Sequence, residues 1–445
     1  MKDSTRTFAQ KFICRLMALI LMGFAIVGHN SNAAGSLYLR NAPQHADAQT
    51  DMVLDWNANA ANAIVGVAAQ RPERGLIRLA MVHIAVYNAV NAIDGNPFES
   101  YGVAPNVVAP ASPEAAAAAA AHDVLVALFP SQQADLDTKY SQSLALVGDG
   151  TAKTNGVSAG QQAAAGILGM RANDGRDAVV PYTPGTGTGV WMPTPPAFLA
   201  AAAPESARVQ PFALNSPSQF RAEPPPELNS KTWTRDYNEV KSLGAATGST
   251  RTPAQTDIGR FWSDQPILQW NRAWRTISVS HVLSLSDNAR FFAMLSTASA
   301  DAIIACWDSK YFYNFWRPVT AIRAGDTDGN PNTEADPNWI GQVTTPNHPE
   351  YPAAHGCFSG ASTNTLRVFF GTDSFDFTID SNIADLTNPV RSYGSFSQSL
   401  AEVLDARVYG GMHYRNSTAA GARIGKQVAK YVTRHFFLPS KGHRD

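Results

Sequence analysis

Three short segments organise this chain: WDSKYFYNFWRP (307–318), HPEYPAAHG (348–356) and RVYGGMH (407–413). They bring three permanent cations and three histidines into little more than a hundred residues of a chain that is only 16% charged. The cations are Lys310, Arg317 and Arg407, and the histidines are His348, His355 and His413. Guanidinium, ammonium and imidazole groups bind phosphate-like oxyanions through charge-assisted hydrogen bonds. The segments therefore predict a site for an oxyanion with the shape and charge of phosphate.

The spacing of the first two cations gives that site a predicted geometry. Lys310 and Arg317 are seven residues apart, so on a helix from Asp287 to Trp316 both would project from one face, about 10 Å apart along the axis. Pro318 is expected to end or kink this helix. The aromatic side chains between the two cations argue against a helix that faces solvent.

Two of the histidines are expected just ahead of helix N-termini. Gly356 breaks the pattern after His355, and a new helix is predicted over 359–370. After His413, the caps Asn416 and Ser417 predict a helix that runs to about residue 435. Free amides and the helix dipole favour anions at such positions. We therefore expect a converging cage without a nucleotide-binding glycine loop.

In this order, Lys-x6-Arg-Pro, Pro-x-x-His-Gly and Arg-x5-His resemble the three-part signature of the vanadium-dependent haloperoxidases. These enzymes share it with the type 2 phosphatidic acid phosphatases and the bacterial acid phosphatases. Each segment alone is weak evidence for this family, whereas all three in this order are a specific signal for it. The resemblance covers residues 301–421 and weakens to a general helical pattern upstream. It implies an all-α fold of helical bundles of the haloperoxidase and acid phosphatase type.

The resemblance also implies a role for each residue. His413 matches the histidine that ligates vanadium directly, or that attacks phosphorus in the phosphatases. His355 matches the acid–base histidine on the opposite side of the oxyanion. Lys310, Arg317 and Arg407 match the cations that neutralise the equatorial oxygens. Lys310 would in addition polarise the peroxide, and vanadate is the implied cofactor.

Two positions depart from the family pattern. The usual Pro-Ser-Gly-His reads Pro-Ala353-Ala354-His here, so the hydroxyl that bonds an equatorial oxygen is missing, at a cost of about 1 kcal/mol. Ala354 still offers the main-chain amide of the family glycine, and Gly356 is also expected to contact the oxyanion. The position four after the last histidine is often Asp and is Ser417 here, a weaker acceptor for orienting the imidazole.

The resemblance leaves a choice between two reactions. The long helical region before the motifs favours a haloperoxidase over the compact acid phosphatases. Trp307 and His348 resemble the halide side of the vanadium site, and histidine at the latter position is typical of bromide rather than chloride enzymes. The preferred function is therefore halide oxidation with hydrogen peroxide, with bromide ahead of chloride. The alternatives are an exported acid phosphatase that turns over phosphate esters through a phosphohistidine and, less favoured, a non-catalytic oxyanion-binding protein.

Other sites are weakly supported by the sequence. A zinc set of His348, His355, Cys357 and His413 lacks paired ligand spacing and leaves the cations unexplained. No Cys-x-x-Cys-His motif indicates haem attachment. Cys306 and Cys357 either pair in an oxidising compartment or pack as small buried hydrophobes, and the sequence leaves both open.

The N-terminus reads as a secretory signal peptide over residues 1–33. Four basic residues precede an apolar run, Leu16–Val27, and cleavage is expected near Ala33. Without these residues, which carry four basic groups and Asp3, the formal charge moves from −1 to −4, so no nucleic acid partner is indicated. No later segment is expected to cross a membrane. We therefore expect a soluble protein in the periplasm or secreted, of unknown oligomeric state.

The remaining sequence predicts a second helical region ahead of the motifs. Periodicity and composition favour helices over 57–69, 74–93, 112–129, 132–147, 154–173, 233–243 and 256–277. His83 is expected to be a packed core histidine. A Pro/Gly-rich stretch at about 179–226 interrupts the helices, and its Trp191, Phe198 and Phe212 could cover a cavity. The predicted division is 34–260 for this region and 261–445 for the bundle with the oxyanion site.

Overall fold

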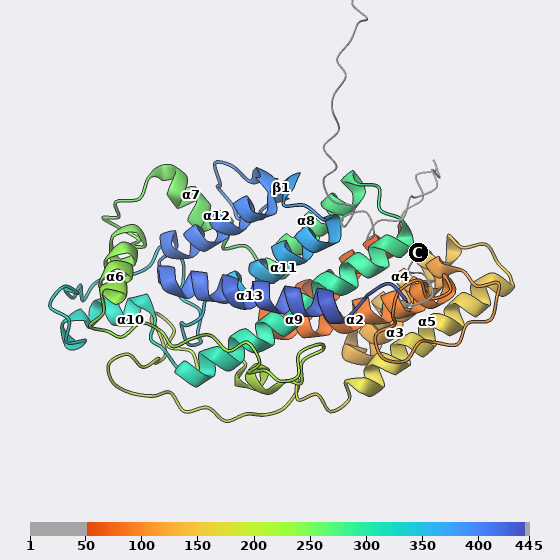
Figure 1. The fold of residues 1–445 in the computed structure, drawn as a ribbon, viewed down its shortest axis with the longest axis horizontal. Helices are drawn as coiled ribbons and strands as arrows, with labels where there is room; N and C mark the ends of the chain where they lie inside the picture. Colours follow the sequence, from red (N-terminus) through yellow and green to blue (C-terminus); the bar gives the residue numbers. More distant parts are fainter. Residues whose placement is uncertain (1–50, 441–445) are drawn as a thin grey trace, which may run out of the picture.

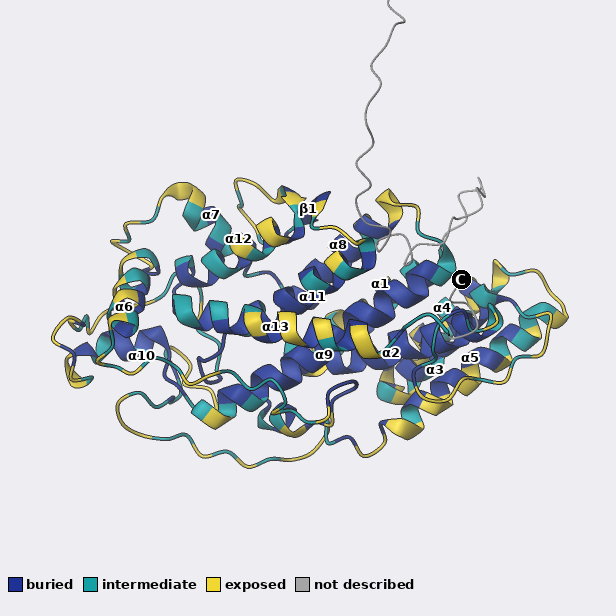
Figure 2. Cartoon of the chain, viewed as in Figure 1, coloured by how far each residue is buried: buried dark blue, intermediate teal, exposed yellow. Residues whose placement is uncertain are grey.

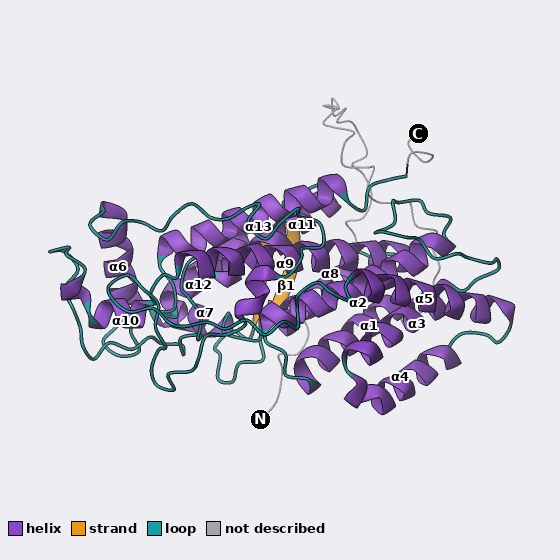
Figure 3. Cartoon of the chain, turned by 90° about the horizontal axis from the view of Figure 1, so that it is seen from below, coloured by secondary structure: helices purple, strands orange, loops and turns teal. Residues whose placement is uncertain are grey.

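Most of the described chain lies in helices, which confirms the helical-bundle expectation (Figure 3). The computed structural model describes residues 51–440, so the predicted signal peptide at 1–33 lies outside the described residues. The molecule is elongated, with N-terminal helices at one end and C-terminal helices in the middle (Figure 1). One two-stranded hairpin, β1 (Ser374–Asp380) antiparallel to β2 (Val390–Ser395), departs from a purely helical description of residues 51–440.

The N-terminal helices form close to the predicted ranges, except that the first begins at Met52, five residues before the predicted start, and continues as a π-helix. They are α1 (Met52–Ala61), a π-helix (Asn62–Val67), α2 (Pro72–Ile93), α3 (Pro113–Leu128), α4 (Gln133–Ala145) and α5 (Thr151–Met170). Ser112 caps α3 by accepting from the amide of Ala115. His83 is buried and makes a 2.9 Å hydrogen bond to Asn57, and burial lowers its pKa to about 3. It is the core histidine that the sequence predicts.

A single long helix, α9 (Leu285–Tyr313), joins the two ends of the molecule. It packs against α2 of the N-terminal group and against α11 (Ala354–Phe370) and α13 (Arg415–His435) of the C-terminal group. Figure 2 shows it as the buried axis of the structure. Residues at its C-terminal end therefore lie close to both groups.

Two of the described helices, α2 and α9, are long and apolar enough to cross a membrane. This corrects the expectation that no segment after the signal peptide has that length and composition. In the structure, 94% and 100% of their most apolar windows are buried inside the protein. Their apolar surface is therefore already packed against other helices of the same chain.

The predicted helix over 256–277 is two helices, α7 (Pro253–Phe261) and α8 (Pro266–Ser280). Proline at a first helical position starts a helix as readily as it stops one. Pro266 does this for α8, so the interpretation of one continuous helix was wrong. The predicted helix 233–243 is α6 (Lys231–Leu243), and α12 (Phe396–Tyr409) completes the C-terminal group.

The helix that was expected to carry both Lys310 and Arg317 ends between them. Asn314 adopts the left-handed conformation, with φ of 50°, and closes α9 one residue after Tyr313. Arg317 is the N-cap of the next helix, α10 (Pro318–Arg323). Pro318 therefore begins a helix instead of ending one, and the two cations do not share a helix face.

Helix α11 meets α13 through glycines. A Cβ atom on Gly356 would lie 2.6 Å from the carbonyl oxygen of Thr418, and one on Gly421 would lie 2.4 Å from that of Ala353. No side chain fits at such distances. The backbones of the two helices are therefore in direct contact near the first turns of both.

The Pro/Gly-rich stretch runs over the surface, with a short 3-10 helix at Pro204–Arg208. Trp191 and Phe212 are buried, whereas Phe198 is 63% exposed and therefore does not pack into the interior. The buried carboxylate of Asp301 on α9 accepts three main-chain amides of residues 212–214 at 2.7–2.9 Å. This contact fixes the end of the stretch to the central helix.

Candidate active site

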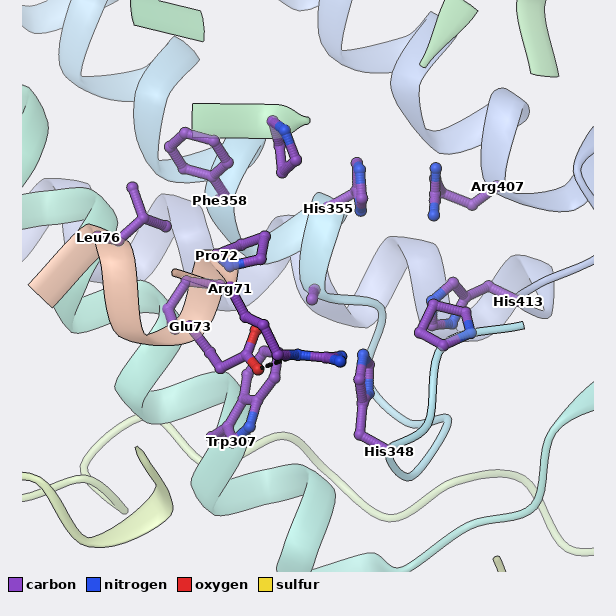
Figure 4. A pocket seen from close by; sticks show the side chains of 14 residues that line it. Arg71, Pro72, Glu73, Leu76, Trp307, His348, His355, Phe358, Arg407 and His413 are labelled. Carbon is purple, nitrogen blue, oxygen red and sulfur yellow. Dashed lines mark hydrogen bonds and ion pairs between the residues drawn. The ribbon is translucent and has the colours of Figure 1, made fainter. Parts of the chain in front are cut away.

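A cavity of about 150 Å³ lies where α9, α11 and α12 approach the start of α2 (Figure 4). Six residues singled out from the sequence line it: Trp307, His348, Ala354, His355, Arg407 and His413. Its other walls come from Arg71, Pro72, Glu73, Leu76, Pro266, Ile303, Pro346 and Phe358. The structure thus brings residues from all three segments to one enclosed space, while Lys310, Arg317 and Gly356 lie behind its wall.

The three predicted cations are buried without carboxylate partners. Lys310 and Arg317 have no exposed surface and Arg407 has 2%. Within residues 51–440, none of them forms a salt bridge; their hydrogen bonds are to carbonyl groups, histidines and a thioether. Burial lowers the pKa of Arg317 to about 10 and that of Arg407 to about 9. A buried charge without a counter-ion is costly, so this arrangement calls for an anion.

Lys310 is held by the second motif segment. Its Nζ donates to the carbonyl oxygens of Pro349 at 2.9 Å, Glu350 at 2.9 Å and Pro352 at 2.5 Å. An ammonium group has three donors, so these bonds use all of them. Lys310 therefore positions the segment that leads into His355, besides contributing charge, and burial lowers its pKa to about 8.

His413 is oriented by a carboxylate that the sequence analysis missed. Its Nδ1 lies 2.8 Å from Oε1 of Glu350, which is fully buried and also accepts from the amide of Tyr414. Nη1 of Arg317 donates to Nε2 of His413 at 3.1 Å, so Nε2 is the acceptor and Nδ1 carries the proton. Burial raises the pKa of Glu350 to about 7, against the opposing effect of Arg317 and Lys310.

This pairing compensates for one departure from the family pattern. A histidine ligand usually donates its second N–H to a carboxylate or carbonyl group, which fixes its tautomer. Ser417 stands where the family often has Asp, and its buried hydroxyl lies beside the carboxylate of Glu350, whose pKa it helps to lower. Glu350 supplies the carboxylate from the second segment instead. Its signal in the sequence was a lone acidic residue inside a stretch otherwise made of neutral residues and histidines.

His355 faces the cavity with an unused nitrogen. It is the second residue of α11, which begins at Ala354, so the expectation that it precedes the helix was wrong. Its Nε2 is buried and has no hydrogen-bond partner in the part of the chain that the structure describes. Burial, and then the charge of Arg407, hold its pKa well below the usual value. A neutral imidazole with a free nitrogen can exchange a proton with a bound ligand.

Ala353 and Gly356 have mainly structural surroundings. Ala353 is the N-cap of α11 without a side-chain cap, and its amide donates to the carbonyl oxygen of Ser417. Gly356 packs against α13, as described above. Ala354 lies on the cavity wall at the first position of the helix. Of the predicted amide contributors, Ala354 is therefore placed at the cavity and Gly356 is placed at the helix contact.

Trp307 and His348 form one wall of the cavity, and the guanidinium group of Arg317 lies between His348 and His413. The ring centroids of Trp307 and His348 are 4.9 Å apart. Nη2 of Arg317 lies 3.0 Å from Nδ1 of His348 and 3.4 Å from its Nε2, and Nδ1 also lies 3.1 Å from the carbonyl oxygen of Pro349. Burial, followed by the charges of Arg317 and Lys310, holds the pKa of His348 well below its usual value. This wall is therefore a neutral, largely apolar surface. It lies beside the three cations Lys310, Arg317 and Arg407, which together are called the floor of the site.

The donor set suits orthovanadate better than a metal cation. Three unpaired buried cations, the free Nε2 of His355 and an unpaired Nε of Arg407 provide charge and donors for an oxyanion. The lone pair of His413 Nε2, which accepts from Arg317 in this structure, would provide one ligand when Arg317 donates to the oxyanion instead. Within residues 51–440, no group of three or more His, Cys, Asp or Glu side chains could hold a metal ion, so the zinc set is not assembled. Cys306 and Cys357 are free, buried and hydrogen-bonded to each other.

Comparison with known proteins agrees with this geometry. Residues 290–440 match the family described as the VCPO second helical-bundle domain. Vanadium chloroperoxidase from Curvularia inaequalis is 27% identical over 280 residues, which are 48% of this chain and 45% of that protein. The match therefore spans less than half the length of that relative.

Two solved structures share the fold over most of their length. One is described as the first bacterial vanadium-dependent iodoperoxidase, with a TM-score of 0.74 and 24% identity over 90% of this chain and 99% of that chain. The other is a holo-type bacterial vanadium-dependent chloroperoxidase, with a TM-score of 0.65 and 18% identity over 87% and 96%. The motif segments and these matches agree: residues 290–440 match the second helical-bundle domain of the vanadium chloroperoxidase type, and the chain shares its fold with solved vanadium-dependent haloperoxidases.

Proposed function

We propose that this chain is a vanadium-dependent haloperoxidase that oxidises halide, bromide ahead of chloride, with hydrogen peroxide. The observation that carries the proposal is the set of three buried cations without carboxylate partners around a histidine whose Nε2 can act as a ligand. The related chloroperoxidase and iodoperoxidase support the same chemistry, although their names differ in the halide. The proposed location, in the periplasm or secreted, rests on the signal-like N-terminus.

The residues of the floor would bind and neutralise the cofactor. Nε2 of His413 would be the ligand to vanadium, with Glu350 holding the opposite nitrogen protonated. Arg407 and Arg317 would donate to the anionic oxygens, and Lys310 would contribute charge from behind the segment it holds. Bound vanadate supplies a Lewis-acidic centre that activates hydrogen peroxide without a change in oxidation state.

His355 would move the proton. Its neutral imidazole lies on the cavity wall with Nε2 unpaired, so it can accept a proton from hydrogen peroxide as the peroxide enters. The resulting imidazolium can return that proton to the departing oxygen. Burial and the surrounding cations favour the neutral ring, and so favour return of the proton.

The decisive experiment measures bromination of an organic acceptor by the apo protein with bromide and peroxide, with and without vanadate. Bromination that needs vanadate, and that is competitively inhibited by phosphate, is the expected result. His413→Ala should abolish both turnover and stoichiometric vanadate binding. His348→Phe should change halide preference while vanadate affinity stays nearly constant, since this residue is not an oxyanion ligand.

The same samples test the other reactions. If the protein hydrolyses phosphomonoesters efficiently and vanadate acts only as an inhibitor, the site is a phosphatase that uses His413 as nucleophile. If vanadate binds but neither reaction occurs, the chain is an oxyanion-binding protein. Either result would overturn the proposed reaction, while the anion site itself would stand.

A further inference from the structure

The rim of the cavity is built by the N-terminal helices, far from the three motif segments in sequence. Arg71, Pro72, Glu73 and Leu76, at the start of α2, line the same space as Trp307 and His413. Arg71 lies more than 200 residues before the first motif. Figure 4 shows its side chain extending across the mouth toward the ring of His348.

The guanidinium group of Arg71 is held in this position by one carboxylate. Its Nε donates to Oε1 of Glu73 at 2.8 Å (Figure 4). The side chain of Glu73 is 2% exposed and that of Arg71 is 43% exposed. The bond uses one of the five guanidinium donors, and no other described residue accepts from the two terminal nitrogens. Arg71 is therefore held through Nε, and its two terminal nitrogens remain available to a ligand.

The charge at the rim differs in kind from the charge at the floor. The floor holds three cations without a carboxylate ion pair of their own, which suits an oxyanion of several negative charges. The rim holds one cation that is already paired with one carboxylate, so its attraction is weaker. Beside it lie the aromatic ring of Trp307 and the neutral imidazole of His348. A weakly hydrated monovalent anion is the ligand that such a rim would take and release.

We propose that Arg71, anchored by Glu73, is the residue that captures the halide at the cavity mouth and holds it against Trp307 and His348. This inference rests on the proposed function, because it names a specificity residue for that reaction. It adds a residue from the N-terminal helices to the halide side that the resemblance already implies at Trp307 and His348, separate from the oxyanion floor. Arg71 would position the halide without touching the vanadium ligand.

The chain offers a matched control three residues away. Arg74 pairs with Glu205 at 2.6 Å, with side-chain exposures of 44% and 4%, and it does not line the cavity. Arg71→Gln and Arg74→Gln therefore remove the same charge from the same helical turn and from equivalent ion pairs. Only the first should change halide binding.

Two measurements test the proposal. In the vanadate-loaded enzyme, Arg71→Gln should raise the KM for bromide roughly tenfold, as expected for loss of a charge-assisted contact, with a much smaller change in kcat. In the apo protein, the excess bromide-81 NMR line width caused by binding should fall in Arg71→Gln and persist in Arg74→Gln. Vanadate affinity should stay the same in both variants. If Arg71→Gln does not fold, Arg71→Lys can be used instead. It keeps the positive charge but lacks the paired donors of the guanidinium group, so its KM for bromide should lie between that of the unsubstituted enzyme and a tenfold higher value.

The outcomes separate the inference from the function it rests on. Vanadate-dependent bromination with an unchanged KM and line width in Arg71→Gln would overturn the capture role and leave the haloperoxidase assignment intact. An equal effect of Arg74→Gln would also overturn it, by showing that net charge alone matters. Bromide binding that depends on Arg71, in a protein that does not brominate, would support the anion position and refute the proposed reaction.

Discussion

Replacing Glu350 by glutamine should separate two ways in which this site binds anions. The carboxylate is fully buried, and its Oε1 accepts from Nδ1 of His413 at 2.8 Å and from the amide of Tyr414 at 3.2 Å. Glutamine has nearly the same shape and keeps an acceptor oxygen, but it lacks the negative charge. The substitution is therefore electrostatic and not steric.

Two effects of Glu350→Gln oppose each other. Loss of a negative charge favours binding of any anion nearby, and for two unit charges about 6 Å apart this amounts to about 3 kcal/mol at an effective dielectric constant of about 20. Loss of the carboxylate–imidazole pair weakens His413 as a ligand, and such outer partners are typically worth about 10- to 100-fold in affinity. The first effect acts on phosphate and vanadate alike. The second acts only on a ligand bound through Nε2, so the ratio of the two affinities isolates it.

Calorimetric titration of the apo protein with vanadate and with phosphate measures this ratio. The dissociation constant for vanadate, divided by that for phosphate, should rise roughly 10- to 100-fold in Glu350→Gln. Asp301→Asn is the control, since this carboxylate is equally buried but binds only main-chain amides away from the cavity. It should lower thermal stability and leave the ratio alone. A ratio that stays constant in folded Glu350→Gln would refute the role given to the Glu350–His413 pair.

Lys310→Met should lower the free energy of unfolding of the apo protein by about 2 kcal/mol or more, because three buried carbonyl groups lose their donor. His355→Ala removes a nitrogen without a hydrogen-bond partner among the described residues, so it should change this free energy by less than about 1 kcal/mol. Denaturant titration compares them, and equal losses would contradict the positioning role of Lys310. Sulfate, whose charge is constant near neutral pH, should bind more weakly as the pH rises through about 8. Lys310 is charged below its pKa of about 8 and neutral above it. A sulfate affinity that stays constant across this range would show that the ammonium group does not contribute to binding. Ala353→Ser should stabilise the protein by about 0.5–2 kcal/mol by capping α11, and an unchanged melting temperature would count against a free cap position.

The sequence predicted the helices and the meeting of the three segments more reliably than the side-chain partners. Helix α3 begins after Ser112 because serine caps and proline starts a helix, and both signals are local. The end of α9 was missed because Asn314 adopts a left-handed conformation inside an aromatic run that carries no glycine or proline. A single residue of positive φ leaves little trace in periodicity.

The partners of the site were harder to predict because they depend on distant contacts. Glu350 was overlooked because the resemblance directed attention to position 417, where an orienting carboxylate is usual. Arg71 and Glu73 reach the cavity only because α9 packs against α2, which no local pattern shows. The hairpin was also missed, although the alternation of Phe375, Phe377 and Ile379 on its buried face has the period of a strand.

The distance between His355 and His413 depends on glycines at the contact between α11 and α13, because these residues have no Cβ atom. Each histidine stands at or just before the first turn of its helix, and the two helices touch where a single methyl group would not fit. A Gly421→Ala change would leave every charged and titratable group in place. It would nevertheless push His355, the proposed acid–base residue, away from His413, the proposed vanadium ligand, because the added methyl group would lie 2.4 Å from a backbone carbonyl oxygen. Glycines at the contact between two helices, which take no part in the proposed reaction, thus set the separation of the two histidines that would face the ligand.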